Sequence, residues 1–261
     1  MTRLTDDWII RRAPRRSGAA VRLFCFHHAG GGASAYQAWP SLLGDQIELC
    51  ALQTPGRENL FGLSRHRDVS SLLSELTPRL RPWLSQPFAF FGHSLGALVA
   101  FATTHQLLRE GGPLPRLLIL SACRPPHAPR EEAFLSDVPE ERLLEAIREL
   151  GSDSASALAN AELREILLPI LRDDLAMAET FPRRPWPPLP RPILVFGGSD
   201  DRSAPLAQLS EWKSYTRAEF DVQIFPGGHF YTEENKEALT RRIRERLTPA
   251  PPFAAGAEAR A

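Results

Sequence analysis

The sequence predicts an α/β fold in which helices flank a mainly parallel β-sheet. Short apolar runs rich in strand-forming residues recur along the 261 residues, and helix-like stretches lie between most of them. The runs are apolar at nearly every position, as in strands that are covered on both faces. Because parallel neighbours are joined by crossovers, the intervening helices are expected to cover both faces of the sheet.

The expected strands follow one another along the chain, beginning with an edge strand at residues 8–12. A helix is expected at residues 97–108 and another at residues 204–215. Together they predict alternating strands and helices with no internal repeat. The six apolar runs lie at residues 21–26, 47–52, 88–91, 117–122, 193–196 and 220–225.

One connection is longer than a single crossover helix requires. Residues 123–192 make 70 residues between two expected strands. We therefore expect a helical lid insertion there, on a core made of residues 1–122 and 193–247; the alternative is a packed helical decoration that does not move. Residues 248–261 are rich in Pro and Ala and are expected to be a disordered tail.

The insertion itself contains three recognisable segments. Residues 140–150 are expected to be a helix that stops at Gly151. Apolar residues recur at helical spacing over 163–175, interrupted at Asp174. Six prolines then fall between residues 182 and 192, which favours an extended return strap.

Composition excludes several classes of protein. The chain is 43% hydrophobic, and its 31 basic and 31 acidic residues give a net charge of zero, so neither nucleic acid nor an anionic membrane is an expected partner. No apolar stretch is long enough to cross a bilayer and no signal peptide is evident, which favours a cytoplasmic protein. Cys25, Cys50 and Cys123 fit no zinc or disulfide pattern and are expected to be buried.

The candidate nucleophile is Ser94, in the G-x-S-x-G sequence of residues 92–96. This motif follows an expected strand directly and opens a helix, so Ser94 is expected on the tight turn called a nucleophile elbow. Glycines on both sides leave room for that turn. The helix N-terminus favours the negative charge that develops on a substrate oxygen. The alternative is a glycine-flanked loop serine.

A serine hydroxyl needs a basic histidine within hydrogen-bond reach and an acid that orients this histidine. His229 follows Pro-Gly-Gly directly after the last expected strand, at the edge where a parallel sheet holds its functional loops. His127 is expected to line an entrance or to be solvated. The remaining histidines lie in other loops, upstream of the motif, or too far along the helix: His27, His28, His66, His93 and His105.

Two adjacent aspartates compete for the role of the acid. Asp200 and Asp201 both follow the expected strand at 193–196. Asp201 is preferred because it completes a Gly-x-x-Asp turn, with Asp200 as the open alternative. The other aspartate is then expected to cap the helix at 204–215.

Catalysis also requires two backbone N–H donors for the oxyanion, each of which contributes about 3 to 4 kcal/mol to the transition state. Leu95 is expected to supply one and Ala29, in the glycine-rich loop after the strand at 21–26, the other. This loop does not fit a phosphate-binding pattern, because G-x-G-x-x-G fails at Ala35. No cofactor and no metal are expected.

The sequence resembles the type II thioesterases of polyketide and nonribosomal peptide synthesis, which have the α/β-hydrolase fold. It departs from their pattern at His27, where the family usually has proline, and at Asn59-Leu60. The resemblance rests on Leu-Phe-Cys-Phe at 23–26, His-Ala-Gly-Gly at 28–31, Pro-Gly-Arg-Glu at 55–58, Gly-His-Ser-Leu-Gly-Ala at 92–97, Leu-Pro-Ile-Leu-Arg-Asp-Asp at 168–174 and Pro-Gly-Gly-His-Phe at 226–230.

The resemblance implies a triad of Ser94, Asp201 and His229, with Ala29 and Leu95 forming the oxyanion hole. It implies hydrolytic editing, in which acyl groups are removed from the phosphopantetheine arms of acyl or peptidyl carrier domains. The lid would shape an acyl pocket, expected beneath residues 163–175 and suited to short or medium chains. A monomer is expected.

Three other functions stay open: a carboxylester hydrolase, a chain-releasing thioesterase, and a catalytically silent module that docks on a synthase. Arg57 and Glu58 are interpreted as a structural ion pair, with substrate contact as the alternative. A carrier or the phosphate of its arm is expected to meet an arginine set, in which solvated surface residues are the alternative for half or more: Arg124, Arg130, Arg183, Arg184 and Arg191.

Overall fold

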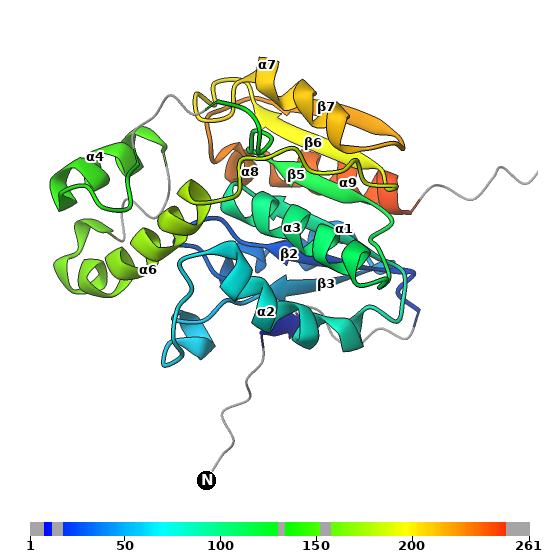
Figure 1. Cartoon of the computed structure of the whole chain (residues 1–261), viewed down its shortest axis with the longest axis horizontal. Helices are drawn as coiled ribbons and strands as arrows, with labels where there is room; N and C mark the ends of the chain where they lie inside the picture. Colours follow the sequence, from blue (N-terminus) through cyan, green and yellow to red (C-terminus); the bar gives the residue numbers. More distant parts are fainter. Residues whose placement is uncertain (1–7, 12–17, 130–133, 152–157, 249–261) are drawn as a thin grey trace, which may run out of the picture.

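The computed structural model describes residues 8–11, 18–129, 134–151 and 158–248. These residues form a seven-stranded sheet of order β1-β3-β2-β4-β5-β6-β7 (Figure 1), in which β1 is antiparallel to β3 and all other neighbours are parallel. The predicted mainly parallel sheet is confirmed, including its edge strand. The strands are β1 Ile9–Arg11, β2 Val21–Phe26, β3 Ile47–Leu52, β4 Phe88–His93, β5 Leu118–Ser121, β6 Ile193–Gly198 and β7 Phe220–Phe225.

Helices cover both faces of the sheet. Figure 1 shows α2 and α3 together on one face, while α1 and α9 pack against the core on the other. The described α-helices are α1 Trp39–Leu43, α2 Val69–Leu80, α3 Leu95–Arg109, α4 Glu140–Glu149, α6 Ala161–Glu179, α7 Leu206–Leu209, α8 Tyr231–Glu234 and α9 Lys236–Leu247. Short 3-10 helices are η1 Ala33–Tyr36, η2 Glu58–Leu60, η3 Arg81–Trp83 and η4 Ser210–Tyr215.

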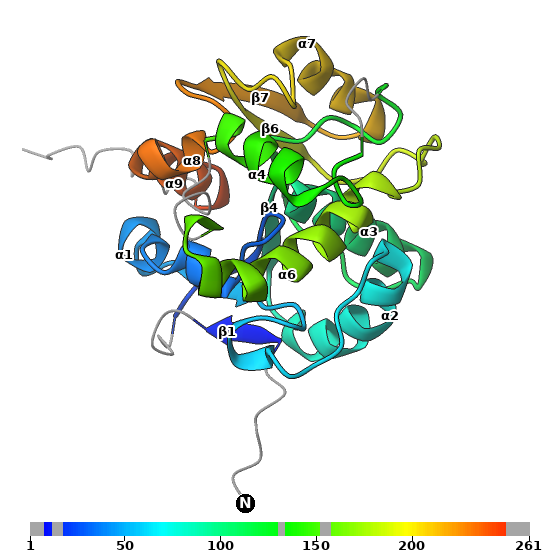
Figure 2. The same cartoon turned by 90° about the vertical axis from the view of Figure 1, so that its left-hand side faces the viewer.

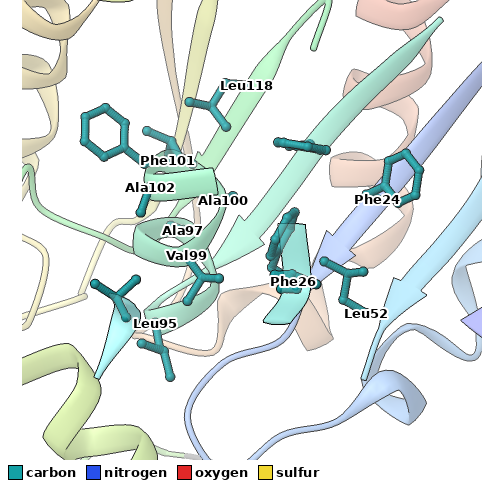
Figure 3. Packing of buried hydrophobic residues seen from close by; sticks show 14 of the residues in the cluster. Phe24, Phe26, Leu52, Leu95, Ala97, Val99, Ala100, Phe101, Ala102 and Leu118 are labelled. Atoms are coloured by element: carbon teal, nitrogen blue, oxygen red, sulfur yellow. The ribbon is translucent and has the colours of Figure 1, made fainter. Parts of the chain in front are cut away.

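The two hydrophobic cores follow from the alternation of side chains along each strand. In β2, Phe24 and Phe26 belong to the core under α2 and α3, whereas Leu23 and Cys25 belong to the core under α1 and α9. Figure 3 shows Phe26 of β2 and Val99 of α3 within the first of these cores. All three cysteines are buried, as predicted.

The segment between β5 and β6 contains α4 and α6, which Figure 2 shows side by side in front of the sheet. Helix α4 is followed by Gly151, whose φ of 73° ends it as expected. The expected apolar stripe over 163–175 is buried only in part: Leu171 is covered, but Leu163 and Ile166 are each 45% exposed.

The proline-rich strap returns the chain to the sheet along α3 and the end of η4. Leu189 makes a parallel bridge with Thr216, and Trp186 packs on Phe101 and His105 of α3. The expected tail lies outside the described residues except for Thr248.

The helix expected at 204–215 begins later and divides into α7 and η4, because Pro205 occupies the N-cap position of α7. No described helix has the length and apolar character that spanning a membrane requires.

Candidate active site

Ser94 lies between the end of β4 and the start of α3, in a strained backbone conformation. Its φ of 55° and ψ of −118° fall where residues other than glycine are rare. A Cβ on Gly92 would lie 2.2 Å from the carbonyl oxygen of Gly96, and one on Gly96 would lie 2.1 Å from that of Phe26. Glycine is therefore required on both sides of Ser94, and the predicted tight turn is present.

The structure brings together the three side chains that the sequence singled out. His229 Nε2 lies 2.9 Å from Ser94 Oγ, and His229 Nδ1 lies 2.9 Å from Asp201 Oδ2. The three residues follow β4, β6 and β7, which are parallel, so their carboxyl ends meet at one edge of the sheet. His229 and Asp201 are buried, while Ser94 is partly open to solvent.

Asp201 uses its two carboxylate oxygens differently. Oδ2 accepts from His229, while Oδ1 accepts from the backbone N–H groups of Ser203 and Ala204. Burial raises the pKa of this carboxyl, but hydrogen bonds from His229 and Ser203 outweigh burial and hold the pKa below its ordinary value. Asp201 is therefore charged at neutral pH.

The expectation that the second aspartate caps the following helix is wrong. Asp200 is exposed, and its Oδ2 accepts from Ser199 Oγ at 2.8 Å. The N–H groups at this turn are held by Asp201 itself, because the chain turns directly after the strand and the helix starts later than expected.

Ser203 was missed at the level of sequence. Its hydroxyl donates to Asp201 Oδ1 at 2.7 Å and lies 2.8 Å from His229 Nδ1. The only sequence signal is a serine two residues after the aspartate, a spacing at which side chains and backbone often bond locally. Ser203 thus helps to fix the relative positions of the acid and the imidazole.

The other histidines near Ser94 are packed within the fold. His93 Nδ1 lies 2.8 Å from Ser121 Oγ, which in turn bonds the hydroxyl of Tyr231. Burial lowers the pKa of His93 well below its ordinary value, and burial followed by the charge of His229 lowers that of His28 to about 4. Both rings are therefore neutral at pH 7.

His127 is held away from these groups. Its Nδ1 lies 2.8 Å from the Tyr215 hydroxyl and its Nε2 lies 3.0 Å from Glu211. Both partners belong to η4, so His127 is part of the surface around that 3-10 helix.

The loop after β2 contains the second predicted oxyanion donor. The Gly30 N–H donates to Asp174 Oδ2 at 2.8 Å and the Gly31 N–H donates to the carbonyl of His28 at 3.0 Å. Within the part of the chain that the structure describes, the amides of Ala29 and Leu95 donate to no other group. Leu95 is the first residue of α3, where N–H groups lack helical partners.

Arg57 forms its ion pair with Asp174 of α6. The guanidinium nitrogens lie 2.6 and 2.8 Å from the two carboxylate oxygens, and both side chains are buried. Glu58, the partner expected from sequence, accepts from Ser34 Oγ at 2.6 Å. The structural interpretation of Arg57 is supported, with a distant aspartate as its partner.

The arginines expected to meet a carrier are spread over the surface. Arg183, Arg184 and Arg191 are exposed on the strap, and Arg184 lies over the Trp186 ring. Arg124 donates to the carbonyl of Pro129. Arg130 lies outside the described residues.

A pocket lies behind the elbow, between β2, α2, α3 and α6. About 440 Å³ of empty space lies between these elements, part of it open to solvent. Helix α6 contributes only Asp174 and Met177, so the pocket does not lie beneath the whole of residues 163–175 as expected. The apolar lining consists of Phe26, Leu52, Leu72, Leu76, Leu95, Val99 and Met177, and the polar lining includes His27, Thr54, Arg57, His66 and Asp174.

The mainly parallel sheet and the serine elbow define an α/β-hydrolase fold. Residues 21–247 match the family model of the thioesterase domain, and the chain belongs to this thioesterase family. No group of three or more His, Cys, Asp or Glu side chains suited to a metal ion occurs among the residues described.

Relatives from biosynthetic pathways cover nearly the whole chain. Over 248 residues it is 32% identical to the gramicidin S biosynthesis protein GrsT of Aneurinibacillus migulanus, a match that covers 94% of this chain and 96% of that protein. The structure is similar to BorB, a type II thioesterase from the borrelidin cluster, with a TM-score of 0.84, 32% identity and coverage of 92% and 97%. RedJ thioesterase from the prodiginine pathway in Streptomyces coelicolor gives a TM-score of 0.81 at 32% identity, with 89% of each chain covered.

Proposed function

We propose that the protein is an editing thioesterase that hydrolyses acyl thioesters on the phosphopantetheine arms of carrier domains in polyketide or nonribosomal peptide synthesis. The observation that carries this proposal is the hydrogen-bonded series Ser94, His229 and Asp201 at the edge of the sheet. The names of GrsT, BorB and RedJ support the biosynthetic setting, because these relatives match the chain almost from end to end.

The reaction follows from the positions of these atoms. His229 Nε2 takes the proton of Ser94 Oγ as this oxygen attacks the thioester carbonyl carbon. The negative charge that moves to the carbonyl oxygen is met by the backbone amides of Leu95 and Ala29. The carbon–sulfur bond then breaks, and the imidazolium returns its proton to the departing pantetheine sulfur.

Water completes the cycle. His229 removes a proton from a water molecule that attacks the acyl-serine, and the carboxylic acid leaves as Ser94 regains its proton. Asp201 stays ionised throughout, and its hydrogen bond to Nδ1 keeps the imidazole in the tautomer that accepts at Nε2.

The acyl chain is assigned to the pocket behind the elbow. Leu95 and Gly96, the two residues after Ser94, form part of its wall, and its apolar lining suits short or medium acyl chains. Helices α4 and α6 of the insertion would act as the lid, because α6 supplies Asp174 and Met177 to this pocket.

The test is the unloading of an acyl-loaded carrier protein, followed by intact-mass spectrometry. The parent protein should return the carrier to its free-thiol form, and Ser94→Ala should reduce the rate at least about 1,000-fold, because triad members act as a unit. Ser210→Ala is the matched control, because the Ser210 hydroxyl donates to the carbonyl of Ala207 in α7. Equal unloading by parent and Ser94→Ala would show that Ser94 is not the nucleophile.

The same assay separates the other functions. A carboxylester hydrolase would cleave oxygen esters faster than pantetheine thioesters of the same acyl group. A chain-releasing enzyme would prefer the full-length product chain to short acyl groups. A silent docking module would leave both kinds of substrate intact.

A further inference from the structure

Helix α6 and the loop after β2 are joined by a buried network of hydrogen bonds. We call residues 27–32 the oxyanion loop. Asp174 Oδ2 accepts the Gly30 N–H at 2.8 Å, and Arg57 Nη1 donates to the Gly31 carbonyl at 2.8 Å. Because Arg57 also binds both carboxylate oxygens of Asp174, the two bonded side chains together hold two peptide groups of one loop.

The oxyanion loop makes a turn at Ala29, the predicted oxyanion donor. The Gly31 N–H closes a bond to the His28 carbonyl, and Gly30 has a φ of 75°. This combination is typical of a type II turn with Ala29 and Gly30 at its centre. The hydrogen bond that closes such a turn uses neither of the two central N–H groups. The Gly30 N–H donates to Asp174, and the Ala29 N–H can donate to a substrate oxygen.

The direction of the Ala29 N–H is set by the two peptide groups on either side of Ala29. The Ala29 N–H and the His28 carbonyl belong to one planar peptide group, and this carbonyl accepts the Gly31 N–H. The next peptide group contains the Ala29 carbonyl and the Gly30 N–H, which Asp174 holds. With the turn closed at His28 and the Gly31 carbonyl held by Arg57, little rotation remains at Ala29.

Stability alone does not require this ion pair. Asp174 is 3% exposed and Arg57 is 6% exposed, and charges this deeply buried lose most of their Coulomb gain to desolvation. Burial raises the pKa of Asp174, but the charge and hydrogen bonds of Arg57 outweigh it and hold the pKa below its ordinary value. Apolar side chains at the same positions could not make the hydrogen bonds to the Gly30 N–H and the Gly31 carbonyl.

We propose that Arg57 and Asp174 are positioning residues that hold the Ala29 amide in place for the oxyanion, and so couple the seating of α6 to catalysis. The inference rests on the proposed thioester hydrolysis. It makes the insertion a part of the catalytic apparatus in addition to a wall of the pocket, because α6 must be docked for the oxyanion loop to be ordered.

The test is a double variant, Arg57→Met with Asp174→Leu, which removes both charges and leaves neither one unpaired. The denaturation midpoint should stay close to that of the parent. On a short acyl-pantetheine thioester, kcat should fall tenfold or more while KM stays within about threefold, because an oxyanion donor acts chiefly in the transition state.

Arg65→Met with Asp173→Leu is the matched control. This pair joins neighbouring residues of the same two segments, with Arg65 Nε 2.6 Å from Asp173 Oδ2. Among the described residues, neither side chain bonds to the oxyanion loop. Its kcat should stay within about twofold of the parent. Asp174→Asn, which preserves the shape of the side chain, is the second variant if the double variant does not fold, and its kcat should also fall.

The outcomes are distinguishable. If the parent and the control pair hydrolyse the thioester and the variants at 57 and 174 match them within twofold, the positioning role is wrong and the proposed function stands. If the parent itself fails to hydrolyse acyl thioesters, the proposed function is wrong and the positioning role falls with it.

Discussion

Asp201 has two tasks at the end of β6, and its geometry lets it perform both. A carboxylate can accept about four hydrogen bonds, and Asp201 directs Oδ2 to His229 and Oδ1 to the turn that follows. The backbone N–H groups of this turn hold the carboxylate still. The residue that orients the imidazole is therefore itself oriented by its own chain.

The adjacent aspartates make a matched pair for mutation. Asp201→Asn should lower kcat/KM for an acyl-pantetheine thioester by about 1,000-fold to 10,000-fold, because the amide favours the wrong tautomer of His229. Asp200→Asn, at an exposed site bonded to Ser199, should stay within about threefold of the parent. Circular dichroism checks that both variants are folded. A larger loss in Asp200→Asn than in Asp201→Asn would contradict the assignment of the acid.

Single residues could be predicted where a local sequence motif coincides with the rule that a parallel sheet holds its functional loops at the carboxyl ends of its strands. Ser94 stands between two glycines at a strand–helix junction, and His229 and Asp201 each follow a strand of the same parallel sheet. The bond between Arg57 and Asp174 was not predictable, because 117 residues separate them and each has a charged neighbour in sequence. Local sequence offered Glu58 as a partner, and only the docking of α6 selects Asp174.

At the scale of elements, apolar runs located the strands but did not give their ends. Strand β4 continues to His93 and β6 to Gly198, because ladder hydrogen bonds persist through residues that carry no apolar side chain. Apolar side chains indicate burial, whereas the length of a strand depends on the backbone groups of the neighbouring strand that can form hydrogen bonds with it.

Helix α6 shows what helical periodicity alone does not predict. Helical periodicity correctly placed Leu163, Ile166 and Leu171 in one helix. Periodicity identifies a shared face but not what covers it, and the first half of α6 extends beyond the core (Figure 1). Its buried half contains Asp174, the residue that interrupts the apolar pattern, because its charge is matched by Arg57.

At the scale of the whole molecule, several histidines are buried in neutral form. Burial lowers the pKa of His27 to about 3, that of His28 to about 4 and that of His105 to about 4. In the unfolded chain these groups return to an ordinary pKa of about 6.5. Since the unfolded chain binds more protons, stability is fully present above that value and is lost as the pH falls toward the folded values.

His105 offers a way to measure this linkage far from the reacting atoms. Urea denaturation at pH values from 7 to 4.5 should show the free energy of unfolding of the parent falling below pH 6.5. In His105→Gln the slope should be smaller by about 1.4 kcal/mol per pH unit, the contribution of one proton. Parallel curves for parent and variant would show that His105 is not held neutral by the fold.

Activation of Ser94 by His229 can be tested directly. We would label the protein with a fluorophosphonate, which reacts with activated serines, and map the adduct by peptide mass spectrometry. We expect one adduct, on Ser94, and a labelling rate at least about 100-fold lower in His229→Ala, because general-base help is lost. An unlabelled Ser94, or equal rates in parent and His229→Ala, would contradict it.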